Sequence, residues 1–295
     1  MKPYRVEAEQ ESISQTGIEF FYYDFQNRKN YVSPHIHSAV ELLWIKSGEY
    51  QIFADDRELF AGAGDTVLFR SNTIHRICSQ TQGDVGYYVF KFSPAFLLDL
   101  AGPENRGLYL LRLALNTKDG KSVWTAAESE ANGLRDAFGV LVEAFEHPSH
   151  ASDVAMKVGA SSVILALLRD LLPEAEQSAE EPMPGAEAMR RIYDVTVYIN
   201  QHYAEALNAA DCAAMAYMSY SYFSRCFFRI TGKSFKEYLN VTRINRAERA
   251  LLCSEKSVTE IAGDCGFNSV SYFIATYKRI KGTTPFSVRQ HRVEL

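Results

Sequence analysis

The sequence of 295 residues predicts a multidomain α+β protein, in which an antiparallel β-barrel with appended helices precedes an all-α region with two helix-turn-helix units. Two observations lead to this fold class. Short segments rich in β-branched and aromatic residues alternate with turn residues in the first third of the chain. Near the other end, SYFSRCFFRITG at 221–232 recurs as SYFIATYKRIKG at 271–282. Two copies are too few for a stacked repeat array, so the duplication indicates a paired module with two equivalent tasks.

The first predicted domain, residues 1–92, consists of strands separated by turns. Asp55-Asp56 and the glycines at 62 and 64 lie between the strand-like segments. Many short strands at this spacing are typical of a sandwich or barrel. The expected strands are 18–23, 40–47, 49–54, 57–61, 65–69, 75–79 and 86–92.

Residues 93–172 change to the periodicity of helices. The clearest segments are 123–145 and 153–172, and both are strongly apolar on one face. Such faces need a partner surface. The sequence leaves two uses open, because the helices could cover the barrel or join a second subunit.

The segment PEAEQSAEEPMPGAE, residues 173–187, separates two parts of opposite charge. It is rich in proline and glutamate and cannot form a buried core, so we predict a linker. The last domain, 188–295, carries 15 Lys+Arg against 9 Asp+Glu, a net charge of +6, whereas the first 187 residues carry −11. A basic region on an acidic chain favours a polyanionic partner, although solvated helix faces often produce the same bias.

No segment has the apolar core of a signal peptide or the ~18 consecutive apolar residues of a membrane-spanning helix. We therefore expect a cytoplasmic protein without a membrane partner. The five cysteines show no CxxC spacing, and most of them lie among apolar helical positions. We expect reduced thiols rather than disulfides or metal ligands.

Two stretches of the last domain have the outline of helix, short turn and helix. Asn208 and Ser257 are candidate N-caps, and Ser257-Val-Thr-Glu260 is a capping-box pattern. In the second helix of each unit, apolar residues at i, i+4 and i+7 form a core-facing stripe. The stripes are Phe223, Phe227 and Ile230 in the first unit and Phe273, Tyr277 and Ile280 in the second. The first unit then exposes Ser221, Tyr222, Ser224 and Arg225.

One uninterrupted helix is predicted between the units, over residues 234–253. Its length is ~30 Å at ~1.5 Å rise per residue. This is close to one turn of B-form DNA, ~34 Å. A rigid connector of that length can place two recognition helices in successive major grooves on one face of a duplex.

Residues 195–292 resemble the DNA-binding domain of AraC-type transcriptional regulators. The matching residues are Ala213, Ser219, Tyr222, Phe223, Arg225, Phe227, Gly232, Phe235, Tyr238, Arg243, Ala247, Leu251, Leu252, Ile261, Ala262, Gly266, Phe267, Ser271, Tyr272, Phe273, Lys278, Gly282, Pro285 and Arg289. The resemblance implies a homodimer that binds double-stranded DNA, responds to a small-molecule effector and activates transcription by RNA polymerase. Repression remains an alternative.

By this resemblance, base contacts of the first unit come from Ser221, Ser224 and Arg225. Arg225 can make a bidentate contact with guanine, and a phosphate or an acidic neighbour is the alternative partner. In the second unit Val270 and Ala275 cannot hydrogen-bond to bases, so the first unit is expected to specify more sequence. The full predicted set is Ser221, Tyr222, Ser224, Arg225, Lys233, Lys236, Ser269, Val270, Ser271, Ala275, Lys278 and Arg279, with Ile274 also exposed and Lys281 as a further phosphate contact.

A second constellation lies in the predicted barrel. His35, His37, Glu41 and His75 follow the spacing HxHxxxE and a distant histidine, which resembles cupin barrels, where three His and one Glu can converge on a divalent metal. The resemblance is imperfect, because SNTIH stands where cupins commonly have a proline-containing turn. By resemblance, regulatory barrels joined to AraC-type domains often keep such histidines without catalysis.

We predict that the barrel binds a small polar effector, for which a sugar is the example we favour. Hydroxyl-rich ligands need directed donors and acceptors beside a stacking face, and the mouths of small barrels are natural ligand sites. The predicted lining is His35, His37, Glu41, Trp44, Arg70 and His75. We predict no catalytic residue and no cofactor, so the chain is not expected to be an enzyme.

Three classes of protein remain open on the sequence. The preferred one is an effector-responsive regulator. The alternative is a cupin metal-binding protein or metalloenzyme fused to a DNA-binding domain, which would contain near-stoichiometric metal. The third is a structural, nucleoid-type DNA binder, whose affinity would depend neither on a small molecule nor on DNA sequence.

Overall fold

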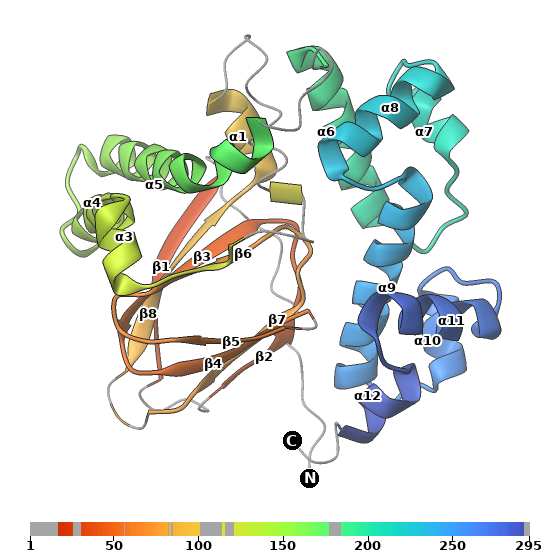
Figure 1. Cartoon of the computed structure of the whole chain (residues 1–295), viewed down its shortest axis with the longest axis horizontal. Helices are drawn as coiled ribbons and strands as arrows, with labels where there is room; N and C mark the ends of the chain where they lie inside the picture. Colours follow the sequence, from red (N-terminus) through yellow and green to blue (C-terminus); the bar gives the residue numbers. More distant parts are fainter. Residues whose placement is uncertain are drawn as a thin grey trace.

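The computed structural model describes residues 17–25, 31–55, 57–81, 83, 85–100, 114–115, 121–176 and 184–291 (Figure 1). The N-terminal half contains antiparallel sheets with helices packed on one side. The described part of the C-terminal half is helical. The predicted fold class is therefore confirmed.

Two antiparallel sheets pack face to face and enclose an apolar interior. The five-stranded sheet has the order β1-β8-β3-β6-β9, and the four-stranded sheet has the order β2-β7-β4-β5. The strands are β1 (Ile18–Asp24), β2 (Tyr31–His35), β3 (Val40–Ser47), β4 (Tyr50–Ala54), β5 (Arg57–Ala61), β6 (Thr66–Phe69), β7 (His75–Ser79), β8 (Gly86–Phe92) and β9 (Val123–Trp124). All the predicted strands are present, and β2 and β9 are additional.

The alternation of side chains along β3 divides the core into two layers. Leu43 and Ile45 point between the two sheets, into the barrel interior. Val40, Leu42 and Trp44 point to the other face of the same strand, where helices cover the five-stranded sheet. Because successive side chains of a strand point to opposite faces, residues an odd number of positions apart belong to different layers.

The helices of the N-terminal half cover the outer face of the five-stranded sheet, one of the two uses that the sequence left open (Figure 1). They are α1 (Pro94–Leu100), α3 (Ala126–Ala131), α4 (Leu134–Glu146) and α5 (Ser152–Glu176). The helix predicted over 123–145 is interrupted: its first two residues form β9, and Gly133, with φ of 86°, separates α3 from α4. The helix predicted over 153–172 corresponds to α5 and continues to Glu176.

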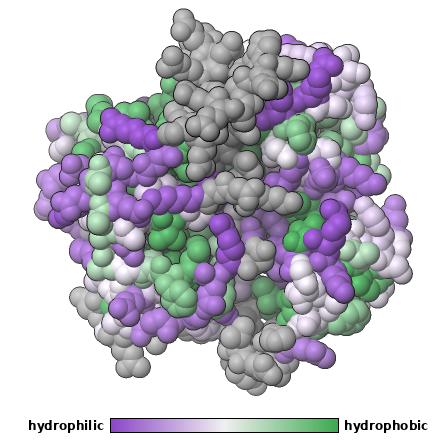
Figure 2. Space-filling model, viewed as in Figure 1, coloured by the Kyte–Doolittle hydropathy of each residue, from purple (hydrophilic) through white to green (hydrophobic). Residues whose placement is uncertain are grey.

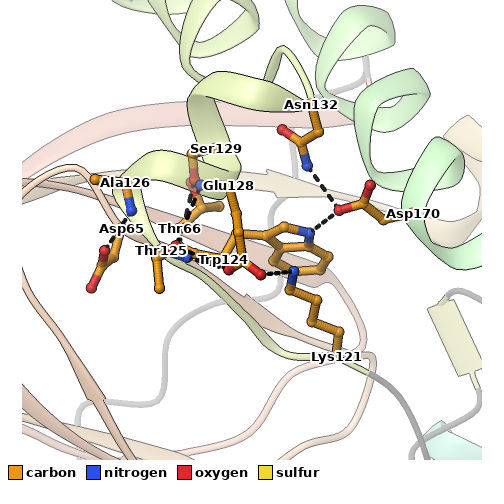
Figure 3. A network of polar contacts seen from close by, with 10 residues as sticks. All are labelled: Asp65, Thr66, Lys121, Trp124, Thr125, Ala126, Glu128, Ser129, Asn132 and Asp170. Carbon is orange, nitrogen blue, oxygen red and sulfur yellow. Dashed lines mark hydrogen bonds and ion pairs between the residues drawn. The ribbon is translucent and has the colours of Figure 1, made fainter.

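A polar network anchors this helical layer to the edge of the sheet (Figure 3). The indole N–H of Trp124 donates to Asp170 on α5 (2.6 Å), and Asn132 donates to the same carboxylate (3.0 Å). On the other side, the backbone N–H of Ala126 donates to Asp65 (2.8 Å). Strand β9 and helix α3 are therefore fixed both to α5 and to the turn that precedes β6.

The C-terminal half consists of α6 (Ala186–His202), α7 (Ala209–Met215), α8 (Tyr220–Thr231), α9 (Phe235–Cys253), α10 (Val258–Asp264), α11 (Val270–Lys281) and α12 (Pro285–His291). The core of α7 and α8 is continuous, through α6, with the helical layer of the barrel. Helices α9 to α12 enclose a separate core. Residues 177–183 of the predicted linker lie outside the described residues, whereas its start, 173–176, belongs to α5 and its end, 186–187, to α6. The domain boundaries stay predictions.

None of the helices in the described ranges combines the length and apolarity needed to cross a bilayer. On the face seen in Figure 2, apolar residues form separate patches among polar and charged ones. All five cysteines are free thiols, and Cys212, Cys226 and Cys265 are buried.

Candidate functional site

The first helix-turn-helix unit is formed by α7 and α8. The side chain of Asn208 caps α7 by accepting the N–H groups of Ala210 and Asp211, both at 3.0 Å. Ser219 caps α8 by accepting the N–H of Tyr222 (3.4 Å). The predicted core stripe, Phe223, Phe227 and Ile230, is fully buried.

The second unit, α10 and α11, repeats this arrangement. The predicted capping box is present: Ser257 Oγ accepts the N–H of Glu260 (3.2 Å), and Glu260 accepts the N–H of Ser257 (2.7 Å). Ser269 caps α11 by accepting the N–H of Tyr272 (3.3 Å). The stripe is Phe273 and Tyr277, both buried, and Ile280, which is half-buried.

The two units differ in the residue that makes the turn. The turn between α10 and α11 contains Gly266 with φ of 79°, whereas the turn between α7 and α8 contains Tyr217 with φ of 54°. Glycine adopts this left-handed conformation without steric penalty, and tyrosine does not. A Cβ atom on Gly266 would lie 2.6 Å from the carbonyl oxygen of Ala204. The second turn therefore requires glycine, both for its left-handed backbone conformation and because no Cβ atom fits beside Ala204.

Helix α9 joins the two units as one unbroken helix of 19 residues, which at ~1.5 Å per residue is ~28 Å long. Ser234 and Glu237 form a capping box at its start. In its middle, Arg243 donates to the carbonyl oxygens of Tyr203 and Glu205, both at 2.7 Å. The predicted connector is therefore present, and Arg243 braces it against the loop that follows α6.

Most of the side chains predicted to contact DNA lie at the surface of these units. The exposed ones are Ser221, Tyr222, Arg225, Lys236, Ser269, Ser271, Ala275, Lys278 and Arg279, and the half-buried ones are Ser224, Val270 and Ile274. The two recognition helices therefore present the faces that the apolar stripes predicted.

Two predicted phosphate contacts are not at the surface. Lys233 is buried, because it lies in the turn between α8 and α9 beside the hydrogen-bonded hydroxyl of Thr231. Lys281 is also buried, because its ammonium pairs with Glu248 (2.7 Å) and Asp55 (3.4 Å). The prediction of Lys281 as an available phosphate contact is wrong for this arrangement of the chain.

Arg225 lies on the exposed face of α8, and its guanidinium forms no hydrogen bond or ion pair with another residue of the described ranges. The alternative in which an acidic neighbour holds its guanidinium therefore has no support here. A free guanidinium on a recognition helix is competent for bidentate contact with guanine or with phosphate.

In the barrel, the four predicted residues converge. His35 comes from β2, His37 from the turn that follows, Glu41 from β3 and His75 from β7. One ligand atom from each lies within 4.8 Å of the others. His37, Glu41 and His75 are buried. We call these four residues the histidine cluster.

The three imidazoles share one pattern of hydrogen bonding. Their Nδ1 atoms approach backbone carbonyl oxygens: Ser33 for His35 (3.0 Å), Ala39 for His37 (3.1 Å) and Thr73 for His75 (3.0 Å). Because a carbonyl only accepts, each Nδ1 carries a proton. The Nε2 atoms of His37 and His75 are then directed at Glu41, at 2.7 Å and 3.6 Å from one carboxylate oxygen.

Glu41 is a charged carboxylate in this buried site. Burial by itself would raise its pKa, but the ammonium of Lys91 (3.3 Å), the hydrogen bond with His37 (2.7 Å) and the nearby ring of His75 (3.6 Å) hold the pKa of Glu41 well below its usual range. Lys91 stands directly opposite Glu41 in the pairing of β3 with β8. Sequence reasoning missed Lys91, because only the strand register brings it to the cluster.

Trp44 does not belong to this site, and its prediction as an aromatic wall is wrong. It lies three positions from Glu41 on the same strand, so its side chain points to the opposite face. There it stacks on Tyr88 (5.8 Å between ring centroids) and Phe138 (5.9 Å), beneath α4. The ring that lies against the cluster is Phe69, which stacks on His75 at 4.0 Å.

Arg70 is also engaged elsewhere. Its guanidinium donates to the hydroxyl of Ser122 (3.3 Å) and to the carbonyl oxygen of Lys121 (3.3 Å). Burial, with a contribution from Arg57, lowers the pKa of Arg70 to about 10. Arg70 therefore ties β6 to the segment before β9, and the hydrogen bonds of its guanidinium are directed away from the histidine cluster.

The histidine cluster has the composition of a divalent metal site. Imidazole nitrogen and carboxylate oxygen suit zinc, iron and manganese. Metal-binding histidines usually donate their second ring nitrogen to a carbonyl, as all three do here. His75 Nε2 is buried and has no hydrogen-bond partner among the described residues. The residues therefore fit a metal ion, although Lys91 already balances the charge of Glu41.

Comparison with known proteins agrees with both halves of this description. A model of the AraC-like ligand binding domain matches residues 17–153, and a model of a helix-turn-helix domain matches residues 212–291. The chain is 24% identical to the HTH-type transcriptional regulator YfiF of Bacillus subtilis, over 92% of this chain and 84% of that protein. It is 32% identical to YijO of Escherichia coli over 43% of each chain.

Among solved structures, ToxT from Vibrio cholerae with a bound unsaturated fatty acid is similar, with a TM-score of 0.46 and 18% identity over 92% of this chain and 94% of that one. The two family matches together cover the barrel, its helices and both helix-turn-helix units. The chain belongs to the AraC family of DNA-binding transcriptional regulators, with a ligand-binding domain ahead of its DNA-binding domain.

Proposed function

We propose that this regulator binds DNA in a sequence-specific way and that a small polar effector at the histidine cluster controls the binding. The observation that carries the first part is the pair of exposed recognition helices fixed at the two ends of α9. The length of this connector, ~28 Å, is close to the ~34 Å repeat of B-form DNA. The buried, convergent polar groups of the barrel support the second part.

The chemistry of the cluster narrows the class of effector. The sequence favours a sugar because Trp44 is expected to supply a stacking face, but Trp44 packs outside the barrel. What remains are the imidazoles of the three histidines, one carboxylate and the ammonium of Lys91. These groups favour a compact ligand that exchanges charge-assisted hydrogen bonds, so we propose a small polar or ionic effector rather than a sugar in particular.

We also propose a homodimer that activates transcription through RNA polymerase, as the family resemblance implies. Helix α5 offers a surface for the dimer. Val154, Val158 and Leu165 lie on one face of it and are 65%, 54% and 52% exposed, although the other face packs on the barrel. Apolar side chains in such a row are typical of helix–helix contacts.

Arg225→Ala should weaken binding to the preferred operator by about 1–3 kcal/mol and relax the preference at one base position. The reason is the loss of the free guanidinium on α8. Selection of duplexes from a random-sequence library gives the base preference at each position. Affinity measurement on the selected site then gives the loss of binding free energy. Unchanged affinity and an unchanged base profile would exclude the assigned recognition helix.

Lys236→Ala is the matched control for that experiment, because Lys236 is an exposed cation outside the recognition helices. It should weaken binding to all duplexes about equally and lower the salt dependence by about one counterion. If Arg225→Ala behaves in the same way, Arg225 contacts a phosphate, and the sequence specificity must come from other residues.

A second candidate for the effector is a divalent metal ion, and the unpartnered Nε2 of His75 favours it. His35, His37, Glu41 and His75 would hold the ion, and it would supply positive charge beside Glu41. Lys91 would then have to leave the position in which it now pairs with Glu41.

Addition of Zn²⁺ to metal-free protein should raise its melting temperature in proportion to the logarithm of the ion concentration, since a ligand of the native state stabilises by mass action. Elemental analysis should find near-stoichiometric metal in the wild type and none in His37→Ala. His147→Ala, which removes an exposed histidine outside the cluster, is the control and should retain the metal. Equal metal content in the two variants, or none in the wild type, rejects the metal candidate.

A further inference from the structure

Tyr272, on the recognition helix of the second unit, is tied to the connector α9 through its hydroxyl group. The side-chain amide of Asn240 donates to this hydroxyl (3.0 Å). Asn240 is buried in α9, whereas Tyr272 is 44% exposed on α11, which packs against α9 (Figure 1). Tyr272 is not among the DNA contacts predicted from the sequence. Its hydroxyl therefore needs an account of its own.

The aromatic ring of Tyr272 is also held in place. It lies against the buried ring of Phe267, with 6.1 Å between the ring centroids. The guanidinium of Arg243 lies over the Phe267 ring (5.7 Å), and the same guanidinium binds two carbonyl groups of the loop after α6. A side chain that is ordered before it meets a ligand loses little entropy on binding. Tyr272 is therefore a preorganised group.

The direction of the hydrogen bond from Asn240 determines what the hydroxyl can do. Because an amide N–H only donates, the oxygen of Tyr272 is the acceptor, and its own proton remains to be donated. The hydrogen bond from Asn240 lowers the pKa of Tyr272, although burial opposes this effect. Smaller contributions in the same direction come from Thr276, Lys236 and Arg279. A phenol of lower pKa is the stronger donor, so this hydroxyl suits an anionic acceptor.

Two cations lie on the same helix faces as this hydrogen-bonded pair. Lys236 is one helical turn before Asn240 on α9, and Arg279 is two turns after Tyr272 on α11. Both cations are exposed, and neither forms an ion pair with an acidic residue in the described part of the chain. A hydroxyl donor together with lysine and arginine is a set of groups that binds phosphate oxygens.

The first unit uses the corresponding tyrosine differently. Tyr222 occupies the position of Tyr272 in the repeat, but its hydroxyl forms a hydrogen bond with Cys226 on its own helix. This bond raises the pKa of Tyr222, because the hydroxyl donates its proton to the sulfur. Of the two repeat tyrosines, Tyr272 is thus the one whose proton remains for a ligand.

We propose that Tyr272 contacts DNA by donating its hydroxyl proton to a backbone phosphate, and that Asn240 is the positioning residue that directs it. The proposal rests on the proposed function, DNA binding by the two recognition helices. It also gives the second unit a task that suits its residues, since Val270 and Ala275 cannot hydrogen-bond to bases. Phosphate contacts fix the register of a protein on the duplex, whereas base contacts specify sequence.

Tyr272→Phe removes the hydroxyl and keeps the ring against Phe267. Affinity should fall about tenfold on all duplexes alike, because a hydrogen bond to a charged group is worth roughly that factor. The base preferences and the salt dependence should stay as in the wild type, because no base contact and no cation is lost. Unchanged affinity overturns the proposal and leaves the proposed function standing, whereas a wild type that binds no duplex rejects both.

Methylphosphonate substitution shows whether the partner of the hydroxyl is a phosphate. Each phosphate of the selected duplex is replaced in turn by a neutral methylphosphonate, and the affinity is measured. The wild type should lose affinity at the phosphate that Tyr272 contacts. Tyr272→Phe should lose markedly less at that phosphate and as much as the wild type at the others. Equal profiles would mean that the hydroxyl acts only through the structure of α11, and they overturn the phosphate contact.

A double-mutant cycle tests the positioning role of Asn240. Asn240→Ala should weaken binding severalfold in the wild type and have little further effect in the Tyr272→Phe background, because Asn240 acts through the hydroxyl. Additive losses reject the positioning role. Asn240→Asp, which keeps the size of the side chain but accepts the tyrosine proton, should behave in the same way and serves if the alanine variant does not fold.

Tyr198→Phe is the matched control. It removes a tyrosine hydroxyl from α6 in the same half of the protein, where the ring stacks on His202 (4.2 Å). Its affinity and its methylphosphonate profile should match those of the wild type. Melting temperatures of all variants show that each is folded at the temperature of the binding measurements. If Tyr198→Phe weakens binding as much as Tyr272→Phe, the effect is not specific to the pair on α9 and α11, and the proposal is rejected.

Discussion

Replacement of Phe227 by alanine is expected to lower the free energy of unfolding of the first helix-turn-helix unit by about 3–5 kcal/mol. Phe227 is fully buried, and its ring contacts Phe223 (5.4 Å between centroids), Phe235 (5.9 Å) and Tyr238 (5.4 Å). Alanine loses the transfer free energy of the ring and leaves a cavity among three other aromatic rings, which cannot close it fully. Since α8 is the helix that carries Arg225, DNA binding should be lost together with the fold.

Phe228→Ala provides the comparison. Phe228 is the next residue on the same helix, and it is 56% exposed, so its removal should change stability by no more than about 0.5 kcal/mol. The free energy of unfolding of both variants is measured by urea unfolding followed by far-ultraviolet circular dichroism. Hydrogen exchange of α8 locates the effect. Similar losses in the two variants would contradict the assignment of the core face of α8.

Gly266→Ala is expected to destabilise the second unit by about 2–5 kcal/mol. A left-handed conformation costs an L-residue about 1–2 kcal/mol, and overpacking adds about 1–3 kcal/mol. The new Cβ would lie 2.6 Å from the carbonyl oxygen of Ala204 and 3.0 Å from its Cα. That loop cannot retreat easily, because Arg243 binds the carbonyl groups on both sides of Ala204.

Gly263→Ala is the control, because it replaces a glycine that has neither a positive φ nor a close neighbour. Gly263 lies in α10, and a Cβ atom there would meet nothing within 4 Å. Alanine is the better helix former by about 0.5–1 kcal/mol, so this variant should be neutral or more stable. Thermal unfolding of the two variants beside the wild type checks the prediction, and a stable Gly266→Ala protein would refute the account of the turn.

The helical half could be predicted from the sequence in detail because its signals are local. Caps such as Asn208 and Ser257, the stripes that include Phe223 and Phe273, and the absence of a helix breaker over 234–253 depend on residues within one or two turns. Local propensity and tertiary packing favour the same structure there. The strands of the barrel were found for a similar reason, because their β-branched and aromatic residues lie between clear turn residues.

The composition of the barrel site could be predicted only in part. The spacing of His35, His37 and Glu41 predicts that they lie together, but the lining predicted from the sequence also includes Trp44, which strand parity alone excludes. That error could have been avoided from the sequence. The presence of Lys91 could not, because its position opposite Glu41 depends on which strands pair and in which register.

The burial of Lys281 illustrates a second limit. On the sequence it is one of several cations near the end of a recognition helix, next to Lys278 and Arg279. Its partners Asp55 and Glu248 are 226 and 33 positions away in the chain. A contact between domains has no periodic signal in the sequence, so a buried interdomain cation looks like an exposed one.

The unequal attachment of the two DNA-reading units bears on how such a regulator can evolve. The interior of α7 and α8 merges with the layer that covers the sensor, whereas the unit formed by α10 and α11 has its own interior. Substitutions in α10 and α11 can therefore accumulate without destabilising the barrel domain. Substitutions in α7 and α8 must preserve both DNA binding and the packing against the barrel's helices. New operator preferences should therefore arise most readily in the second helix-turn-helix unit, while the base preference of the first unit changes more slowly.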